Sequence, residues 1–211
     1  MKVIPFISKS ILELSANSYF LIDEQNRAIV IDPSFEGREA IDFLKNNHLT
    51  LKAILLTHGH FDHIRGVNIL LKEYNVPVYI GEEDEEFLTN PTLNCSDRFS
   101  RKNITLKAEP ILIKDGDSIN VLSESIFVIA TPYHTEGSKC FYLKDSDILF
   151  SGDSLFKESV GRSDFSTSSP HKMKDSLKKL MSLPKETKVY PGHNEETTIE
   201  HEQKLNPFVK I

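Results

Sequence analysis

The sequence predicts an α/β fold in which two β-sheets carry helices on their outer faces. Short apolar runs with strand character recur along the chain, and helical apolar patterns lie between some of them. Strands and helices alternate first, several strands then follow in succession, and a strand and a helix end the chain. This order favours two sheets with outer helices over one doubly wound sheet.

The predicted strands are short, mostly apolar segments. They are Val3–Ile7, Ser18–Ile22, Ala28–Ile31, Ala53–Leu56, Pro77–Ile80, Ile111–Ile113, Ile119–Leu122, Ile126–Ala130, Cys140–Leu143, Ile148–Phe150 and Lys188–Tyr190. All are much shorter than the roughly 20 apolar residues that a membrane-spanning helix needs. We therefore expect no membrane partner.

Two segments, His63–Tyr74 and Met173–Met181, have the apolar spacing of amphipathic helices. A last helix is expected from Thr197 through about Leu205. Ser169 and Pro170 are a helix-start pair ahead of the second segment, and Thr197 and Glu200 have capping-box spacing at the start of the last helix. The acidic run Glu82–Glu86 suits the first turn of a helix, and we expect it to be a solvated helix face rather than a metal site.

Length and charge limit the classes of function. The chain has 211 residues, and we expect one domain spanning residues 1–211. Lys and Arg total 25 against 31 Asp and Glu, which gives a formal net charge of -6. Because phosphate backbones repel an acidic protein, we expect no nucleic-acid partner.

Cysteine usage and the N-terminal segment predict a cytoplasmic protein. Cys95 and Cys140 are too few for the disulfide framework of a secreted protein, and we expect both to be small buried hydrophobic residues. Charges at Lys2, Lys9 and Glu13 leave no apolar run for a signal peptide.

A dense histidine segment, Thr57-His58-Gly59-His60-Phe61-Asp62-His63, directly follows the predicted strand Ala53–Leu56. In an extended strand-end loop, residues two apart point the same way, so His58, His60 and Asp62 can converge. His63 then faces a neighbouring point. Imidazole and carboxylate are the ligands that borderline divalent cations prefer, so one loop can serve two metal ions.

Three further strands each deliver a ligand-type side chain beside Gly or Pro. They lead to His134, Asp153 and His193. Strand ends on a rigid scaffold commonly hold functional side chains, and glycine allows the backbone to approach closely. Together with the histidine segment they predict one metal site.

With these motifs the sequence resembles the metallo-β-lactamase superfamily, whose strand-end loops carry THxHxDH, then His, Asp and His in that order. The resemblance spans nearly the whole chain. The segments TPYHTEGS, SGDSLF, VGRSDF, PGHN and TTIEHEQKLNPF are similar to the glyoxalase II group, especially its short single-domain branch. The resemblance implies a four-layer αβ/βα sandwich with the site along one edge.

The resemblance also implies a role for each candidate residue. His58, His60 and His134 would bind a first metal ion, while Asp62, His63 and His193 would bind a second one, with Asp153 bridging both. The implied cofactors are two divalent ions, zinc before iron or manganese. In the glyoxalase II group a basic residue at the position of Arg162 contacts glutathione. An internal contact of Arg162 with Asp164 that shapes the loop is the alternative.

Two departures from the family pattern concern the substrate. Tyr133 and Glu136 stand where the family usually has Gly and Pro, and we expect them to reshape one wall of the pocket. Only 18 residues follow His193 (211 − 193), too few for the helical domain that helps the longer enzymes to hold glutathione. Glutathione specificity therefore does not follow from the resemblance.

Two adjacent metal ions can share a water, lower its pKa toward neutrality and present hydroxide to a polarised carbonyl. A thiolate leaving group, whose thiol has a pKa of about 8.5, departs without prior protonation, whereas an amide nitrogen needs a proton. We therefore expect hydrolysis of a small-molecule (2-hydroxy)acyl thioester, such as a hydroxyacylglutathione, with Asp62 and Asp153 as the catalytic carboxylates.

Other branches of the same fold provide the alternatives. The main one is a mononuclear iron persulfide dioxygenase, which also carries a GRxD segment like Gly161–Asp164. The lactam-cleaving branch more often lacks an aspartate at the position of Asp153, and the flavodiiron branch has Glu in place of His60. A nuclease would need a basic groove, and an inactive binding protein would be expected to have lost ligands. The oligomeric state stays open.

Overall fold

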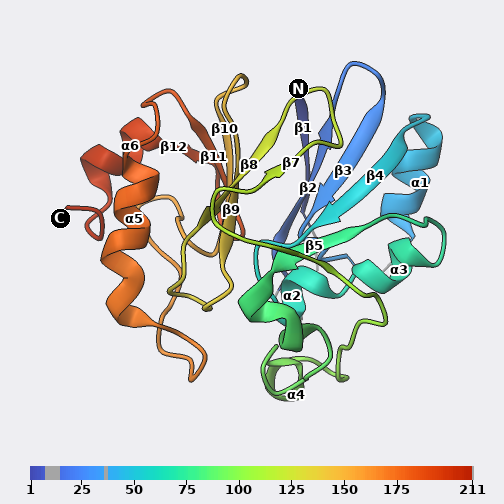
Figure 1. The fold of residues 1–211 in the computed structure, drawn as a ribbon, viewed down its shortest axis with the longest axis horizontal. Coiled ribbons are helices and arrows are strands. Elements are labelled where there is room, and N and C mark those ends of the chain that lie inside the picture. Colours follow the sequence, from blue (N-terminus) through green and yellow to red (C-terminus); the bar gives the residue numbers. More distant parts are fainter. Residues whose placement is uncertain (8–14, 36–37, 211) are drawn as a thin grey trace.

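The computed structural model describes residues 1–7, 15–35 and 38–210. Two six-stranded sheets lie face to face, and helices cover the outer face of each sheet (Figure 1). The predicted four-layer α/β sandwich is therefore confirmed. Lys9 and Glu13, which support the expectation of no export signal, lie outside the described residues.

The first sheet has the strand order β1-β2-β3-β4-β5-β6. Its strands are β1 (Lys2–Ile7), β2 (Asn17–Ile22), β3 (Arg27–Ile31), β4 (Thr50–Leu55), β5 (Val78–Gly81) and β6 (Ile111–Ile113). The first three strands pair antiparallel, and β3 to β6 pair parallel. Parallel neighbours need a crossover. Here the crossovers are α1 (Glu39–Asn46), then α2 (Phe61–Ile64) with α3 (Val67–Leu71), then η1 (Glu82–Leu88) with α4 (Ser96–Phe99).

The second sheet has the strand order β12-β11-β10-β9-β8-β7. Its strands are β7 (Ser118–Ile119), β8 (Ile126–Ala130), β9 (Lys139–Leu143), β10 (Ile148–Gly152), β11 (Lys188–Pro191) and β12 (Thr197–Thr198). Only β10 and β11 pair parallel, and η2 (Pro170–Lys172) with α5 (Met173–Met181) forms the crossover between them. The last helix, α6 (Ile199–Leu205), packs beside α5.

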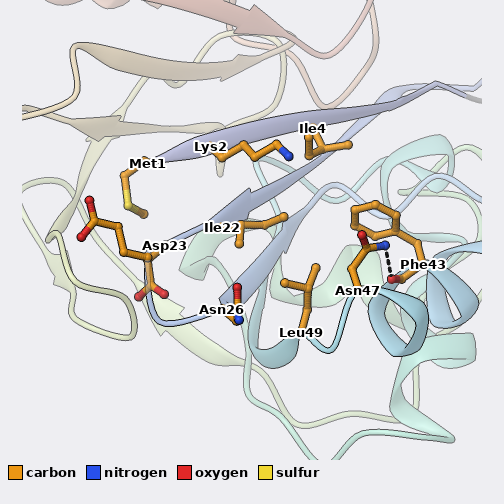
Figure 2. Close-up of a pocket in the computed structure, with 10 residues that line it drawn as sticks. Met1, Lys2, Ile4, Ile22, Asp23, Asn26, Phe43, Asn47 and Leu49 are labelled. Atoms are coloured by element: carbon orange, nitrogen blue, oxygen red, sulfur yellow. Dashed lines mark hydrogen bonds between the residues drawn. The ribbon is translucent and has the colours of Figure 1, made fainter.

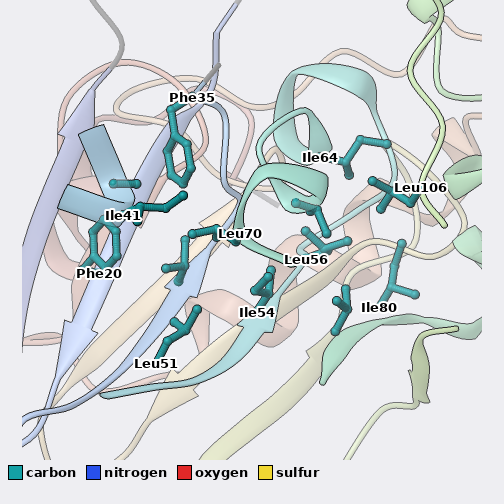
Figure 3. Packing of buried hydrophobic residues seen from close by; sticks show 14 of the residues in the cluster. Phe20, Phe35, Ile41, Leu51, Ile54, Leu56, Ile64, Leu70, Ile80 and Leu106 are labelled. Atoms are coloured by element: carbon teal, nitrogen blue, oxygen red, sulfur yellow. The ribbon is translucent and has the colours of Figure 1, made fainter. Parts of the chain in front are cut away.

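Successive side chains of a strand point to opposite faces of the sheet, so the apolar residues of one strand belong to separate cores. Phe20 and Ile54 belong to the core between the first sheet and its helices (Figure 3). Their neighbours Leu21 and Leu55 belong to the core between the two sheets. Leu149 on β10 packs instead into a third core under α5 and α6. Burial on both faces explains why the inner strands have continuous apolar sequences.

The predicted helix His63–Tyr74 is wrong as a single element, because the chain breaks at Gly66 into α2 and α3. The Gly66 amide donates a hydrogen bond to the Pro33 carbonyl at 2.7 Å. A Cβ atom on Gly66 would lie 2.8 Å from that same oxygen. The close backbone approach therefore overrides the helical spacing of the apolar side chains.

The acidic segment differs from its prediction at one position. Glu82–Glu86 begins the 3-10 helix η1, and Glu83, Glu85 and Glu86 are exposed as expected. Asp84 is fully buried. Three hydrogen-bond donors from other loops surround its carboxylate, and tertiary contacts of this kind are not visible in a run of charges.

Two smaller predictions at the ends of elements are also wrong. Strand β7 ends at Ile119, whereas Ile119–Leu122 was predicted. The N-cap of α6 is Thr198, whose hydroxyl accepts a hydrogen bond from the His201 amide. Thr197 belongs to the short strand β12, which was not predicted.

Cys95 and Cys140 are buried free thiols, as predicted. Within the described ranges, no helix has the length and apolar character needed to cross a membrane.

Candidate metal centre

The predicted ligands lie at the ends of four strands, where the two sheets meet. The histidine segment follows β4 of the first sheet, and α2 carries Asp62 and His63. His134, Asp153 and His193 follow β8, β10 and β11 of the second sheet. The structure brings all seven side chains together in three overlapping groups.

The first group consists of His58, His60 and His134. Nδ1 of His60 lies 3.0 Å from Nε2 of His58 and 2.9 Å from Nε2 of His134. Burial, together with the neighbouring imidazoles, holds the pKa of His58 well below its usual range and lowers the pKa of His60 to about 3. The rings of His58 and His60 are therefore neutral at pH 7, which is the form that binds a metal ion.

The second group consists of Asp62, His63 and His193. Oδ2 of Asp62 lies 3.3 Å from Nε2 of His193 and 3.9 Å from Nε2 of His63. Burial alone would raise the pKa of Asp62, but the two imidazoles lower it. Burial alone would likewise lower the pKa of His63 and of His193, but the surrounding carboxylates raise both. The negative charge of the carboxylates around these two imidazoles can stabilise a bound cation as well as a proton.

Asp153 lies between the two groups. Its Oδ1 is 3.3 Å from His63 Nε2, and its Oδ2 is 3.5 Å from His134 Nε2 and 3.6 Å from His193 Nε2. Burial would raise its pKa, but His193 and His63 hold that pKa well below its usual range. One ionised carboxylate therefore contacts both groups, as a bridging ligand must.

Two buried atoms test whether these residues fit metal ions. Nε2 of His63 and Oδ1 of Asp153 lie 3.3 Å apart but make no hydrogen bond among the described residues. A buried nitrogen and a buried oxygen without hydrogen bonds are costly unless something else binds them. Since both atoms face the cluster and are ligand types for zinc or iron, the residues fit two divalent ions. The individual ligand roles remain predictions.

Asp32, at the end of β3, is a site residue that the sequence reasoning missed. Its carboxylate lies 2.9 Å from Nδ1 of His63, and it accepts hydrogen bonds from the Thr57 amide at 2.7 Å and the Thr57 hydroxyl at 2.6 Å. This contact orients the other nitrogen of His63 toward the cluster. A polar residue directly after a predicted strand and before Pro33 was the available signal.

Asp84 is the second missed residue, and it joins two ligand-bearing loops. Its carboxylate accepts hydrogen bonds from the Gly59 amide at 2.9 Å, the Thr135 hydroxyl at 2.7 Å and the Gly137 amide at 2.8 Å. Gly59 stands between two predicted ligands, and Thr135 directly follows His134. No pattern in the sequence connects this carboxylate with those loops.

Arg162 makes the internal contact that was the alternative to substrate binding. Its Nε and Nη2 donate to the two carboxylate oxygens of Asp164 at 2.6 and 2.7 Å. The guanidinium lies 4.4 Å from the centre of the Phe165 ring. The Arg162 carbonyl lies 2.7 Å from Nδ1 of His134, so the backbone of this loop orients a predicted ligand.

The cluster opens into a cavity of about 440 Å³, a size that suits a small molecule. The lining residues are His60, Phe61, Asp62, Cys95, Phe99, His134, Asp153, Phe156, Ser159, Val160, Arg162, Phe165, His193 and Asn194. A second cavity, of about 450 Å³, lies between β1 and α1, and none of the predicted ligands lines it (Figure 2).

The expectation that Tyr133 and Glu136 reshape a wall of the cavity is wrong. Tyr133 is fully buried, and its hydroxyl donates a hydrogen bond to the Ser154 carbonyl. Glu136 accepts hydrogen bonds from Ser169 and Lys172. Neither residue lines the cavity, because both side chains point into neighbouring loops.

A profile of the Metallo-beta-lactamase superfamily matches residues 12–193. The chain belongs to this superfamily. Among its members, the chain is 35% identical over 197 residues to the probable metallo-hydrolase YqgX of Bacillus subtilis (strain 168), and the match covers 93% of each chain. It is 29% identical over 195 residues to the hydroxyacylglutathione hydrolase GloC of Haemophilus influenzae (strain ATCC 51907 / DSM 11121 / KW20 / Rd), covering 92% of each.

Solved structures of the superfamily have the same fold. The crystal structure of the BLEG-1 B3 metallo-beta-lactamase superposes with a TM-score of 0.92 at 33% identity, over 100% of both chains. TTHA1623 in a di-iron-bound form superposes with a TM-score of 0.82 at 32% identity, over 97% of this chain and 99% of that chain. The fold, the family and the His/Asp cluster together identify a metal-dependent hydrolase of the metallo-beta-lactamase superfamily.

Proposed function

We propose that this protein hydrolyses thioesters of small 2-hydroxy acids, of which a hydroxyacylglutathione is an example. The observation that carries the proposal is the complete donor set, in which Asp153 contacts both groups of predicted ligands. The similarity to GloC supports the substrate class.

When bound, two divalent ions would supply an activated water and polarise the thioester carbonyl. His58, His60 and His134 would hold one of them, Asp62, His63 and His193 would hold the other, and Asp153 would contribute to both sites. Asp62 and Asp153 also line the cavity, so their oxygens can accept a hydrogen bond from the attacking water.

The lining residues favour a thioester over an amide. Among the described residues that line the cavity, no side chain outside the predicted ligands donates a proton near neutral pH, since burial raises the pKa of Cys95 and Arg162 stays protonated. A thiolate leaves without protonation, whereas a lactam nitrogen needs a proton.

Zinc is the proposed metal, and iron is the first alternative because of the di-iron neighbour. Manganese accepts the same ligand types. We propose a small-molecule thioester as the partner of this protein, and neither a nucleic acid nor a membrane. The proposed location of the protein is the cytoplasm.

The deciding experiment compares three reactions on one metal-analysed preparation. Release of free thiol from S-lactoylglutathione, oxygen uptake with glutathione persulfide, and hydrolysis of a chromogenic cephalosporin would be measured in parallel. The similarity to a B3 metallo-beta-lactamase justifies the third reaction. We expect thiol release to be fastest, with two ions per chain. Oxygen uptake with one bound iron and no thiol release would identify a dioxygenase instead. Cephalosporin hydrolysis alone would identify a lactamase.

A further inference from the structure

We propose, on the basis of the thioesterase function above, that the preferred substrate carries an uncharged aromatic group next to the thioester. The proposal concerns the cavity beside the metal cluster. Four phenylalanines line that cavity, Phe61, Phe99, Phe156 and Phe165.

Two of these rings flank the predicted metal ligands on either side. The centre of the Phe165 ring lies 5.1 Å from that of His60 and 5.8 Å from that of His134, both in the first group. The centre of the Phe156 ring lies 5.9 Å from that of His193, in the second group. A substrate bound at the cluster would therefore lie close to the rings of Phe165 and Phe156.

Phe99 extends these walls toward solvent. Its side chain, on the short helix α4, is 48% exposed although it lines the cavity. Exposed phenylalanine is costly in water, and the free energy is recovered when an apolar ligand covers the ring. An aromatic group bound against Phe99 and Phe165 would gain this burial.

The charges around the cavity oppose a strongly anionic carrier. Apart from the histidines, Arg162 is the one basic residue among the described residues that line the cavity, and Asp164 pairs with two of its three guanidinium nitrogens. Lys157, next to Phe156, pairs with Glu195 at 2.6 Å. The carboxylates of glutathione would therefore lose water and gain only one cation in the cavity, whose charge a neighbouring carboxylate already partly neutralises.

Binding is tested separately from catalysis, by titration calorimetry of the metal-loaded protein. The probes are S-benzyl-N-acetylcysteamine and S-methyl-N-acetylcysteamine, neither of which can be hydrolysed. We expect the benzyl compound to bind about tenfold more tightly, a difference of about 1.4 kcal/mol. Phe99→Ala should remove most of this difference, and Phe208→Ala, which changes an equally exposed ring outside the cavity, should not.

Equal binding of the two probes would overturn the proposal. A preference that survives both Phe99→Ala and Phe165→Leu would overturn it as well, provided that metal analysis shows full occupancy in each variant. Because these measurements need no turnover, they decide the question even if no thioester is cleaved. In that case only the proposed function fails.

A comparison of kcat/KM for two aromatic thioesters then shows on which side of the thioester the aromatic group lies. S-mandeloylglutathione places it on the acyl side, and the lactoyl thioester of benzyl mercaptan places it on the thiol side. We expect kcat/KM for one of them to exceed that for S-lactoylglutathione about tenfold. S-lactoylglutathione as the best substrate, with a loss specific to it in Arg162→Gln, would show that a charged carrier is recognised and overturn the proposal.

Discussion

At the scale of single residues, Asp153 is the test of the two-ion assignment. Its two oxygens face histidines of both groups, so removing them should release one ion and lower turnover. We expect Asp153→Ala to bind about one ion per chain by elemental analysis and to lose roughly a hundredfold or more in kcat.

The matched control for this substitution is Asp145→Ala, which removes an exposed carboxylate in the turn after β9. That variant should retain both ions and full turnover. Two bound ions and undiminished thioester hydrolysis in Asp153→Ala would remove the bridging assignment.

Replacing Arg162 distinguishes a role in substrate binding from a role in loop structure. If its guanidinium contacts remote substrate atoms equally in ground and transition states, Arg162→Ala should raise KM several-fold and leave kcat nearly unchanged. If it only orders the loop through Asp164 and Phe165, metal content or melting temperature should fall instead. We expect the rise in KM. KM, melting temperature and metal occupancy are measured on one preparation, and an unchanged KM with a lower melting temperature would assign Arg162 to the scaffold alone.

At the scale of elements, Asp84 connects η1 with the loops that carry the first group of histidines. Both carboxylate oxygens of Asp84 accept hydrogen bonds. In Asp84→Asn, the side-chain NH2 group replaces one of these oxygens and faces a group that also donates a hydrogen bond. We expect a loss of about 1–3 kcal/mol in the free energy of unfolding, and weaker binding of the first ion.

Urea unfolding of the metal-free protein measures the stability change, and competition with a chromogenic chelator measures ion affinity. Glu85→Gln is the control, because Glu85 is the exposed neighbour on the same 3-10 helix. Wild-type stability together with wild-type ion affinity in Asp84→Asn would contradict the assigned contact between the loops.

At the scale of the whole molecule, the pH dependence of stability reports on buried charges far from the metal cluster. Asp23 is buried at the turn from β2 to β3 and pairs with Arg27. Burial would raise its pKa, but the hydrogen bonds from Arg27 and Gln25 lower it below the usual value. A carboxylate with a lowered folded-state pKa stabilises the protein above the unfolded-state pKa of about 3.9. That stabilisation is lost as the pH falls through the folded-state value.

Asp23→Asn should therefore cost about 1–3 kcal/mol at pH 7 and progressively less below about pH 4. Urea unfolding of both metal-free proteins at pH 7, 5, 4 and 3 measures the difference. Because titration of the metal ligands affects both proteins alike, it cancels in this comparison. A difference that stays constant from pH 7 to pH 3 would show that ionisation of Asp23 does not contribute.

The layered α/β architecture and the seven candidate ligands could be predicted from the sequence alone. Strand residues and ligand residues follow each other directly along the chain, so local patterns such as the THGHFDH segment carry this information. The helical spacing of Met173, Leu177, Leu180 and Met181 likewise predicted a helix, and α5 contains all four residues.

The contacts between distant segments could not be predicted from the sequence. Asp32 reaches His63 across 31 residues, and Asp84 reaches Gly137 across 53 residues. The break at Gly66 likewise depends on the carbonyl of Pro33. The same holds for Tyr133, which departs from the family pattern but is buried away from the cavity. Such contacts follow from how the two sheets and their loops pack, and a single sequence shows which residues are present but not which of them packing brings together.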